Sequence, residues 1–121
     1  MPVKKIMVVD DSPTERLVLT DLLTRNGYGV VAADSGEQAI ILAKQELPDL
    51  ILMDVVMPGM NGYQATRTIS REEATRHIPI IMCTSKDQET DKIWGMRQGA
   101  QGYLVKPINP AELLAKVASM G

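Results

Sequence analysis

Short apolar runs alternate with longer amphipathic segments along the chain, and this alternation limits the folds that it can adopt. The apolar runs are five or six residues long and cover residues 4–9, 28–33, 49–53, 78–83 and 101–105. The segments between them carry apolar residues at helical spacing and cover residues 13–27, 35–47, 62–75 and 87–98, with a last helix starting after 109. Runs of this length and composition are typical of buried strands, so the pattern predicts five strand–helix units.

The predicted strands show no alternation of polar and apolar residues. Strands of this kind are covered by helices on both faces, which is typical of parallel sheets with right-handed crossovers. The pattern therefore predicts an α/β fold: a doubly wound (βα)5 parallel sheet of five strands in the order 2-1-3-4-5, the flavodoxin-like arrangement. A chain of 121 residues is long enough for one domain with its own core, so we expect a single domain over 1–121.

Capping residues mark the beginnings of the predicted helices. Ser12 to Glu15 and Ser35 to Gln38 both have the spacing of a capping box. Asn109 followed by Pro110 predicts the start of the last helix, and Asp87 is the expected N-cap of the helix before it.

Composition and charge exclude several classes of function. The formal net charge is −2, so no basic surface is available for nucleic acid. The single cysteine, Cys83, cannot form an internal disulfide, and no Cys or His cluster provides a zinc site. No apolar stretch is long enough to insert into a membrane, and the N-terminus does not resemble a signal peptide. We therefore expect a cytoplasmic protein, monomeric at rest, with dimerisation on activation left open.

Polar and charged side chains follow four of the predicted strands, where the carboxyl ends of parallel strands meet at one edge. They are Asp10 and Asp11 after the first strand, Asp54 after the third, Thr84 and Ser85 after the fourth, and Lys106 after the fifth. In this strand order the ligand crevice lies at that edge, between strands 1 and 3. Helix capping needs only one side chain, so it does not explain the adjacent aspartates or the third one.

Three converging carboxylates predict a divalent cation. Hard oxygen ligands without nearby His or Cys favour Mg²⁺, with Mn²⁺ as the alternative. A cation of this kind and a lysine together suit phosphoryl transfer, in which a carboxylate can be the nucleophile. Asp54 is the best candidate, because it stands alone and precedes a loop with two glycines, Gly59 and Gly62.

The sequence resembles the receiver domains of two-component response regulators. The matching motifs are VVDD at the first strand, LILMDVVMPGMNG around Asp54, IIMCTS at the fourth strand and GYLVKPI at the fifth. They have the order and spacing of that family and cover essentially the whole chain. The resemblance implies that Asp54 accepts a phosphoryl group from a histidine kinase. It implies that Asp11 binds Mg²⁺ directly, Asp10 largely through water, and Val56 through its backbone carbonyl.

The same resemblance implies a switch next to the acceptor. Thr84 and Lys106 hold phosphoryl oxygens, Tyr103 is the switch aromatic, and the Lys106-Pro107 bond is expected to be cis. The expected output face, whose affinity for a downstream target protein changes on phosphorylation, is formed by Lys92, Met96, Tyr103 and Val105.

Three further motifs resemble a narrower group of receivers. They are DDSPTE, GYQATR and SKDQETDKIWGMRQGA, which are similar to the stand-alone receivers of the chemotaxis-like system controlling twitching motility by type IV pili. This implies a chemotaxis-type histidine kinase as partner and no output domain in the chain. Flagellar chemotaxis, phototaxis and a role as a phosphate sink are the alternatives within the family.

Two functions from other classes fit the fold but not the residues. A Mg²⁺-dependent aspartyl phosphatase needs a general acid near the nucleophile, whereas the residue two positions after Asp54 is Val56. A flavin carrier needs a phosphate-binding loop after the first strand, and DDSPTE is acidic there. We therefore expect a phosphoryl-accepting switch and not an enzyme.

Overall fold

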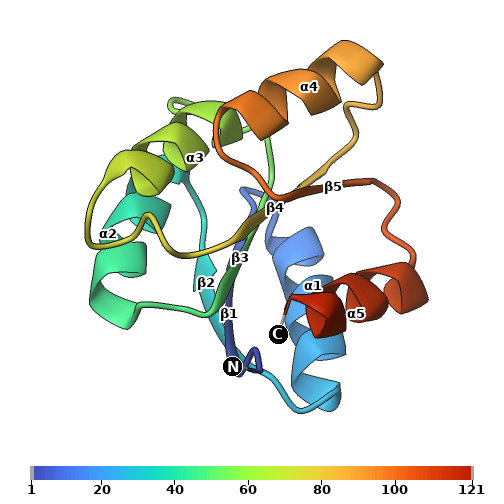
Figure 1. The fold of residues 1–121 in the computed structure, drawn as a ribbon. Coiled ribbons are helices and arrows are strands. Elements are labelled where there is room, and N and C mark those ends of the chain that lie inside the picture. Colours follow the sequence, from blue (N-terminus) through green and yellow to red (C-terminus); the bar gives the residue numbers. More distant parts are fainter. Residues whose placement is uncertain (1, 121) are drawn as a thin grey trace.

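The computed structural model describes residues 2–120, in which five strands alternate with five helices (Figure 1). The strands are β1 (Lys5–Val9), β2 (Gly29–Ala33), β3 (Leu50–Met53), β4 (Ile80–Thr84) and β5 (Gly102–Val105). The helices are α1 (Pro13–Arg25), α2 (Gly36–Glu46), α3 (Gly62–Arg71), α4 (Glu89–Arg97) and α5 (Pro110–Ser119).

All five strands are parallel and lie in the order β2-β1-β3-β4-β5. The predicted doubly wound fold is therefore confirmed. Val9, the last residue of β1, pairs with Ala33 on one side and with Met53 on the other. This register brings the carboxyl ends of β1 and β3 together, and the residues that follow them become neighbours.

Helices cover both faces of the sheet, as Figure 1 shows: α1 and α5 lie on one face, and α2, α3 and α4 on the other. Successive strand residues therefore enter two separate cores. Met7 and Val9 pack with α2 and α3, whereas Ile6 and Val8 pack with α1 and α5. Full burial of one such side chain contributes about 1.5–3 kcal/mol, which explains why these strands are apolar throughout.

Two helix ends differ from the sequence-based prediction. The helix predicted over 62–75 ends at Arg71, because the buried Thr75 folds back and donates its hydroxyl to the Ile69 carbonyl at 2.8 Å. The N-cap of α4 is Gln88 and not Asp87, and the Asp91 carboxylate accepts the Gln88 N–H at 3.2 Å. Each shift reflects a hydrogen bond that periodicity alone does not specify.

Within residues 2–120, every helix is too short or too polar to cross a lipid bilayer.

Asp49 links the beginnings of β1 and β3, and it yields a prediction about stability. Its carboxylate accepts the Lys4 and Lys5 N–H groups, both at 2.9 Å. The Lys5 and Lys4 hydrogen bonds lower the pKa of Asp49 below its ordinary value. The stabilisation is therefore present above the pKa that Asp49 has in the unfolded protein. It is lost as the pH falls through the pKa that Asp49 has in the folded protein.

We expect Asp49→Asn to lower the free energy of unfolding at pH 7 by less than about 1 kcal/mol, because the site is exposed. Urea denaturation at several pH values measures this, and the deficit should shrink as the solution is acidified towards pH 3. Asp34→Asn, which removes an exposed charge next to β2, is the control. An equal pH profile for the two variants would contradict the assignment.

Candidate functional site

Two buried aspartates directly follow neighbouring strands. The sheet pattern continues through their backbones, because Asp10 donates its N–H to Ala33 at 3.1 Å and Asp54 donates its N–H to Val9 at 3.0 Å. The exposed fractions of these aspartates are 1% and 6%. The strand ends thus hold two carboxyl groups rigidly at the carboxyl edge of the sheet.

Asp11 completes a group of three carboxylates at this edge. One oxygen from each of Asp10, Asp11 and Asp54 lies within 4.8 Å of the other two. Asp11 is exposed, so water has access to the group on that side. Hard oxygen donors with space for water are what Mg²⁺ requires, since the ion keeps several waters when a protein binds it. The residues present therefore fit the predicted cation.

The Lys106 ammonium group is in contact with three carboxylates. Its Nζ lies 2.9 Å from Asp10, 3.1 Å from Glu15 and 3.6 Å from Asp54. Burial on its own lowers the pKa of Lys106. The hydrogen bond with Asp10 and the charges of Asp54 and Asp10 outweigh that effect and raise the pKa above its ordinary value. Lys106 is therefore a permanent positive charge at the site.

Burial raises the pKa of Asp54 to about 6. The positive charge of Lys106 opposes this rise, and the negative charge of Asp10 adds to it. The Asp54 Oδ1 atom accepts the Val55 N–H at 2.8 Å, which orients the carboxyl group. A carboxylate that is poorly solvated in this way gains from any cation or covalent bond that neutralises it.

The loop after Asp54 ends at Gly62, which packs directly against the Asp54 backbone. The Gly62 N–H donates to the Val55 carbonyl at 2.9 Å, and a Cβ on Gly62 would overlap the Asp54 carbonyl oxygen. Only glycine allows α3 to begin so near the acceptor. Val56 lies at the open side of this loop, with 58% of its surface exposed.

Thr84 and Tyr103 meet at the β4–α4 loop. Thr84 is fully buried, and its hydroxyl accepts the Lys86 N–H at 3.3 Å. Tyr103 donates its hydroxyl to the Lys86 carbonyl at 2.9 Å. Burial and the neighbouring Tyr63 hydroxyl raise the pKa of Tyr103, so this hydroxyl remains a donor at neutral pH. Thr84 and Tyr103 are therefore both hydrogen-bonded to the Lys86 backbone.

The four residues of the expected output face occupy α4 and β5. Lys92 and Met96 lie on α4, and Tyr103 and Val105 lie on β5. All four are at least partly exposed. A Cβ on Gly95 would lie 3.3 Å from the Tyr103 ring, so the glycine lets α4 approach β5 closely.

The peptide bond between Lys106 and Pro107 is cis. Pro107 lines an open cavity of about 470 Å³ together with Asp11, Asp54, Val56, Ser85, Glu15 and Lys106. This cavity provides access to the Asp54 carboxyl group from solvent.

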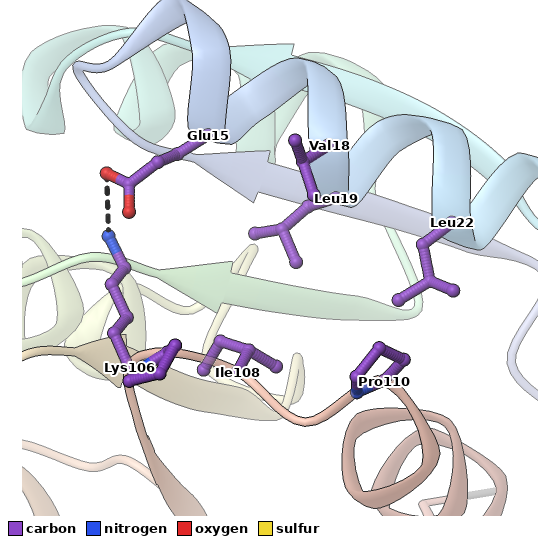
Figure 2. A pocket seen from close by; sticks show the side chains of 8 residues that line it. Glu15, Val18, Leu19, Leu22, Lys106, Ile108 and Pro110 are labelled. Atoms are coloured by element: carbon purple, nitrogen blue, oxygen red, sulfur yellow. Dashed lines mark ion pairs between the residues drawn. The ribbon is translucent and has the colours of Figure 1, made fainter.

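A second cavity, apolar and about 240 Å³ in volume, adjoins the first (Figure 2). Val18, Leu19 and Leu22 of α1 face two residues across it: Ile108 of the β5–α5 loop and Pro110, the first residue of α5. The ion pair between Glu15 and Lys106 closes one end. We refer to this cavity as the α1 groove. Val18 is 61% exposed.

Sequence reasoning missed the contact made by Glu15. The capping-box pattern predicts that its carboxylate returns to the Ser12 N–H. The Ser12 hydroxyl does cap the Glu15 N–H at 3.3 Å, but the Ser12 N–H donates to Asp10 at 2.9 Å. The Glu15 carboxylate is therefore free to pair with Lys106. The only signal for this in the sequence is the aspartate two residues before the cap.

The structure thus combines a five-stranded parallel sheet with three acids and a lysine at its carboxyl edge. The sequence matches the family described as response regulator receiver domain over residues 6–118. The chain belongs to this family.

Individual relatives agree with the family assignment. The chain is 51% identical over 113 residues to protein PilH of Pseudomonas aeruginosa, covering 93% of each chain. It is 40% identical to the response regulator PleD of Caulobacter vibrioides, of which it spans 26%. Among solved structures, the chemotaxis protein CheY4 of Vibrio cholerae has a TM-score of 0.92 at 33% identity, covering 98% of this chain and 99% of its own. The predicted likeness to PilH-type receivers is confirmed.

The buried acceptor carboxylate yields a prediction about pH. The folded pKa of Asp54, about 6, lies above its ordinary value of 3.8, so ionisation opposes folding. The contribution of Asp54 to the free energy of unfolding is fully present below the pKa that it has in the unfolded state. This contribution is lost as the pH rises through the pKa that it has in the folded state. In metal-free buffer we expect Asp54→Asn to stabilise the protein at pH 7.5 by roughly 1–3 kcal/mol.

Urea denaturation in EDTA at pH 4 and pH 7.5 measures this effect, with pH 4 as the internal control. The gain should be small at pH 4, where the wild-type carboxyl group is protonated as well. A gain that is the same at both pH values would show that burial does not perturb Asp54.

Proposed function

We propose that this receiver domain accepts a phosphoryl group on Asp54 from a phosphohistidine of a histidine kinase and then changes its affinity for a target protein. One observation carries this proposal: Asp10, Asp11, Asp54 and Lys106 converge at one solvent-accessible edge of the sheet. Receiver domains are phosphoacceptor switches and not enzymes with turnover, and the membership of this chain in the family supports the same role.

The residues divide the work of phosphoryl transfer among them. An Asp54 carboxylate oxygen attacks phosphorus, the P–N bond of the phosphohistidine breaks, and its electron pair stays on the imidazole nitrogen, which takes up a proton. The Lys106 ammonium and the Thr84 hydroxyl hold the oxygens of the transferred group. The buried Asp10 carboxylate keeps Lys106 in place for this role.

Mg²⁺ fits the acidic cluster, with Mn²⁺ as the alternative. Asp10, Asp11 and Asp54 would hold it together with the Val56 backbone carbonyl. When bound, the ion neutralises the charge that accumulates on the phosphoryl oxygens. It also removes the mutual repulsion of the three carboxylates, which burial makes unfavourable.

The switch follows the chain of contacts from Thr84 to Tyr103. When Thr84 moves toward the phosphoryl group, its hydrogen bond with Lys86 is strained, and the Tyr103 contact to the Lys86 carbonyl changes with it. Because Gly95 leaves the ring next to α4, repacking of Tyr103 alters the face formed by Lys92, Met96, Tyr103 and Val105. This is a population shift between two states, biased by phosphorylation.

The likeness to PilH supports a place in the chemotaxis-like system that controls twitching motility by type IV pili. The phosphodonor is then a chemotaxis-type histidine kinase and the output a contact with a cytoplasmic target protein. The α1 groove supports docking of the donor, since it presents apolar surface directly beside Lys106.

Incubation with acetyl phosphate or beryllofluoride in Mg²⁺ tests this function. We expect the wild type to take up one phosphoryl group from acetyl phosphate, and either reagent to change the fluorescence of Trp94, the only tryptophan. Trp94 lies on α4 and is 48% exposed, so it reports on the output face. Asp54→Asn should abolish uptake, as measured by intact-protein mass or phosphate-binding gels.

Asp49→Asn is the matched control, because it removes an aspartate at the opposite end of the same strand. It should take up the phosphoryl group as the wild type does. Uptake that persists in Asp54→Asn would place the acceptor elsewhere. No uptake by the wild type, from acetyl phosphate or from a phosphorylated histidine kinase, would refute the proposed function.

A further inference from the structure

Among the residues that the structure describes, Glu15 is the one ion-pair partner of Lys106 that lies outside the acidic cluster. It is the third residue of α1, and Figure 2 shows its side chain crossing from the helix to Lys106 on the loop after β5. Its carboxylate lies 3.1 Å from the Lys106 Nζ atom. The cation-binding group described above does not include it.

The contacts of Lys106 differ in how easily they are exchanged. The Asp10 side chain is 2% exposed, so removing the Lys106 ammonium group from it would leave a buried charge unpaired, which is unfavourable. The Glu15 side chain is 48% exposed, and water can replace the ammonium group there. Glu15 also lines both cavities, so its carboxylate has space on two sides to move away.

A phosphoryl group on Asp54 needs the same ammonium group. In the unphosphorylated protein this group is shared: Lys106 donates a hydrogen bond to Asp10 at 2.9 Å and pairs with Glu15 at 3.1 Å, whereas its 3.6 Å separation from Asp54 is too long for a hydrogen bond. Movement of the ammonium group toward a phosphoryl oxygen on Asp54 therefore weakens its contact with one of the other two partners. The partner with the smallest cost of displacement is Glu15.

We propose that Glu15 is a positioning residue that competes with the phosphoryl group on Asp54 for Lys106, and thereby sets how strongly phosphorylation drives the switch. The inference rests on the proposed function, because it assumes that Lys106 binds the phosphoryl oxygens. It gives this part of α1 a regulatory role besides helix capping.

Titration with beryllofluoride at saturating Mg²⁺, followed by Trp94 fluorescence, tests the inference. Glu15→Gln keeps the shape of the side chain and removes its charge. We expect about two- to fivefold tighter beryllofluoride binding, the range of an exposed ion pair. Mg²⁺ binding without beryllofluoride should instead weaken, because Lys106 is then drawn toward Asp10 and Asp54.

Glu112→Gln is the matched control. Glu112 occupies the same third position of α5, after a proline, and its N–H is capped by the Asn109 side chain at 3.0 Å. It makes no ion pair in the described part of the chain, so its substitution reproduces the loss of charge at a capped helix start without touching Lys106. An equal effect of the two substitutions would overturn the inference.

A double-mutant cycle separates competition for Lys106 from a general effect of charge. In a Lys106→Met background, Glu15→Gln should no longer change beryllofluoride affinity. If that background binds no beryllofluoride, the Mg²⁺ titration serves instead, and the effect of Glu15→Gln on it should largely disappear. An effect of undiminished size would overturn the inference.

The two proposals fail differently. A wild type that binds beryllofluoride normally, together with a Glu15→Gln variant that behaves identically, would refute the role of Glu15 alone. A wild type that neither binds beryllofluoride nor takes up a phosphoryl group would refute the proposed function and the role of Glu15 with it.

Discussion

The buried carboxylates of Asp10 and Asp54 lie at the carboxyl edge of the sheet, where desolvation makes negative charge unfavourable. The Lys106 ammonium group contacts both and offsets part of that cost. The compensation is incomplete, since the pKa of Asp54 is still raised to about 6. A site with unbalanced negative charge is prepared to bind a divalent cation.

The fold brings the two aspartates and Lys106 together. The order of strands makes β1 and β3 neighbours, so their terminal aspartates meet, and the last strand delivers Lys106 from the far edge. The start of α1 also contributes to this site, through a departure from the usual capping-box hydrogen bonds. Asp10 accepts the Ser12 N–H, so the Glu15 carboxylate does not accept it. Glu15 forms an ion pair with Lys106 instead. The start of α1 is thus part of the acceptor site.

Rigidity is distributed unevenly around the acceptor. On one side, Gly62 brings the first turn of α3 against the Asp54 backbone, and the overlap that a Cβ would cause leaves little freedom there. On the other side, α4 approaches β5 at Gly95, and its exposed surface carries Trp94 and Met96. Glycine within a helix lowers its stability by about 1 kcal/mol relative to alanine. The backbone of Asp54 is therefore tightly packed, whereas α4 contains a residue that lowers helix stability.

The sequence by itself determined the five strand–helix units and the parallel sheet, because apolar periodicity and the burial of both sheet faces are properties of short segments. The order of the strands was predicted from the common arrangement of such units, and the structure has that order. It also placed Asp10, Asp54 and Lys106 directly after strands whose ends meet at one edge, whereas Thr84, expected after the fourth strand, is the last residue of β4. Only the tertiary structure decided where α3 ends, which cap begins α4, and that Glu15 pairs with Lys106. The two helix ends depend on hydrogen bonds between near neighbours, Thr75 with Ile69 and Gln88 with Asp91, for which the sequence offers several competing partners. The Glu15 contact depends on Lys106, which is distant in the chain and becomes a neighbour only when the sheet forms.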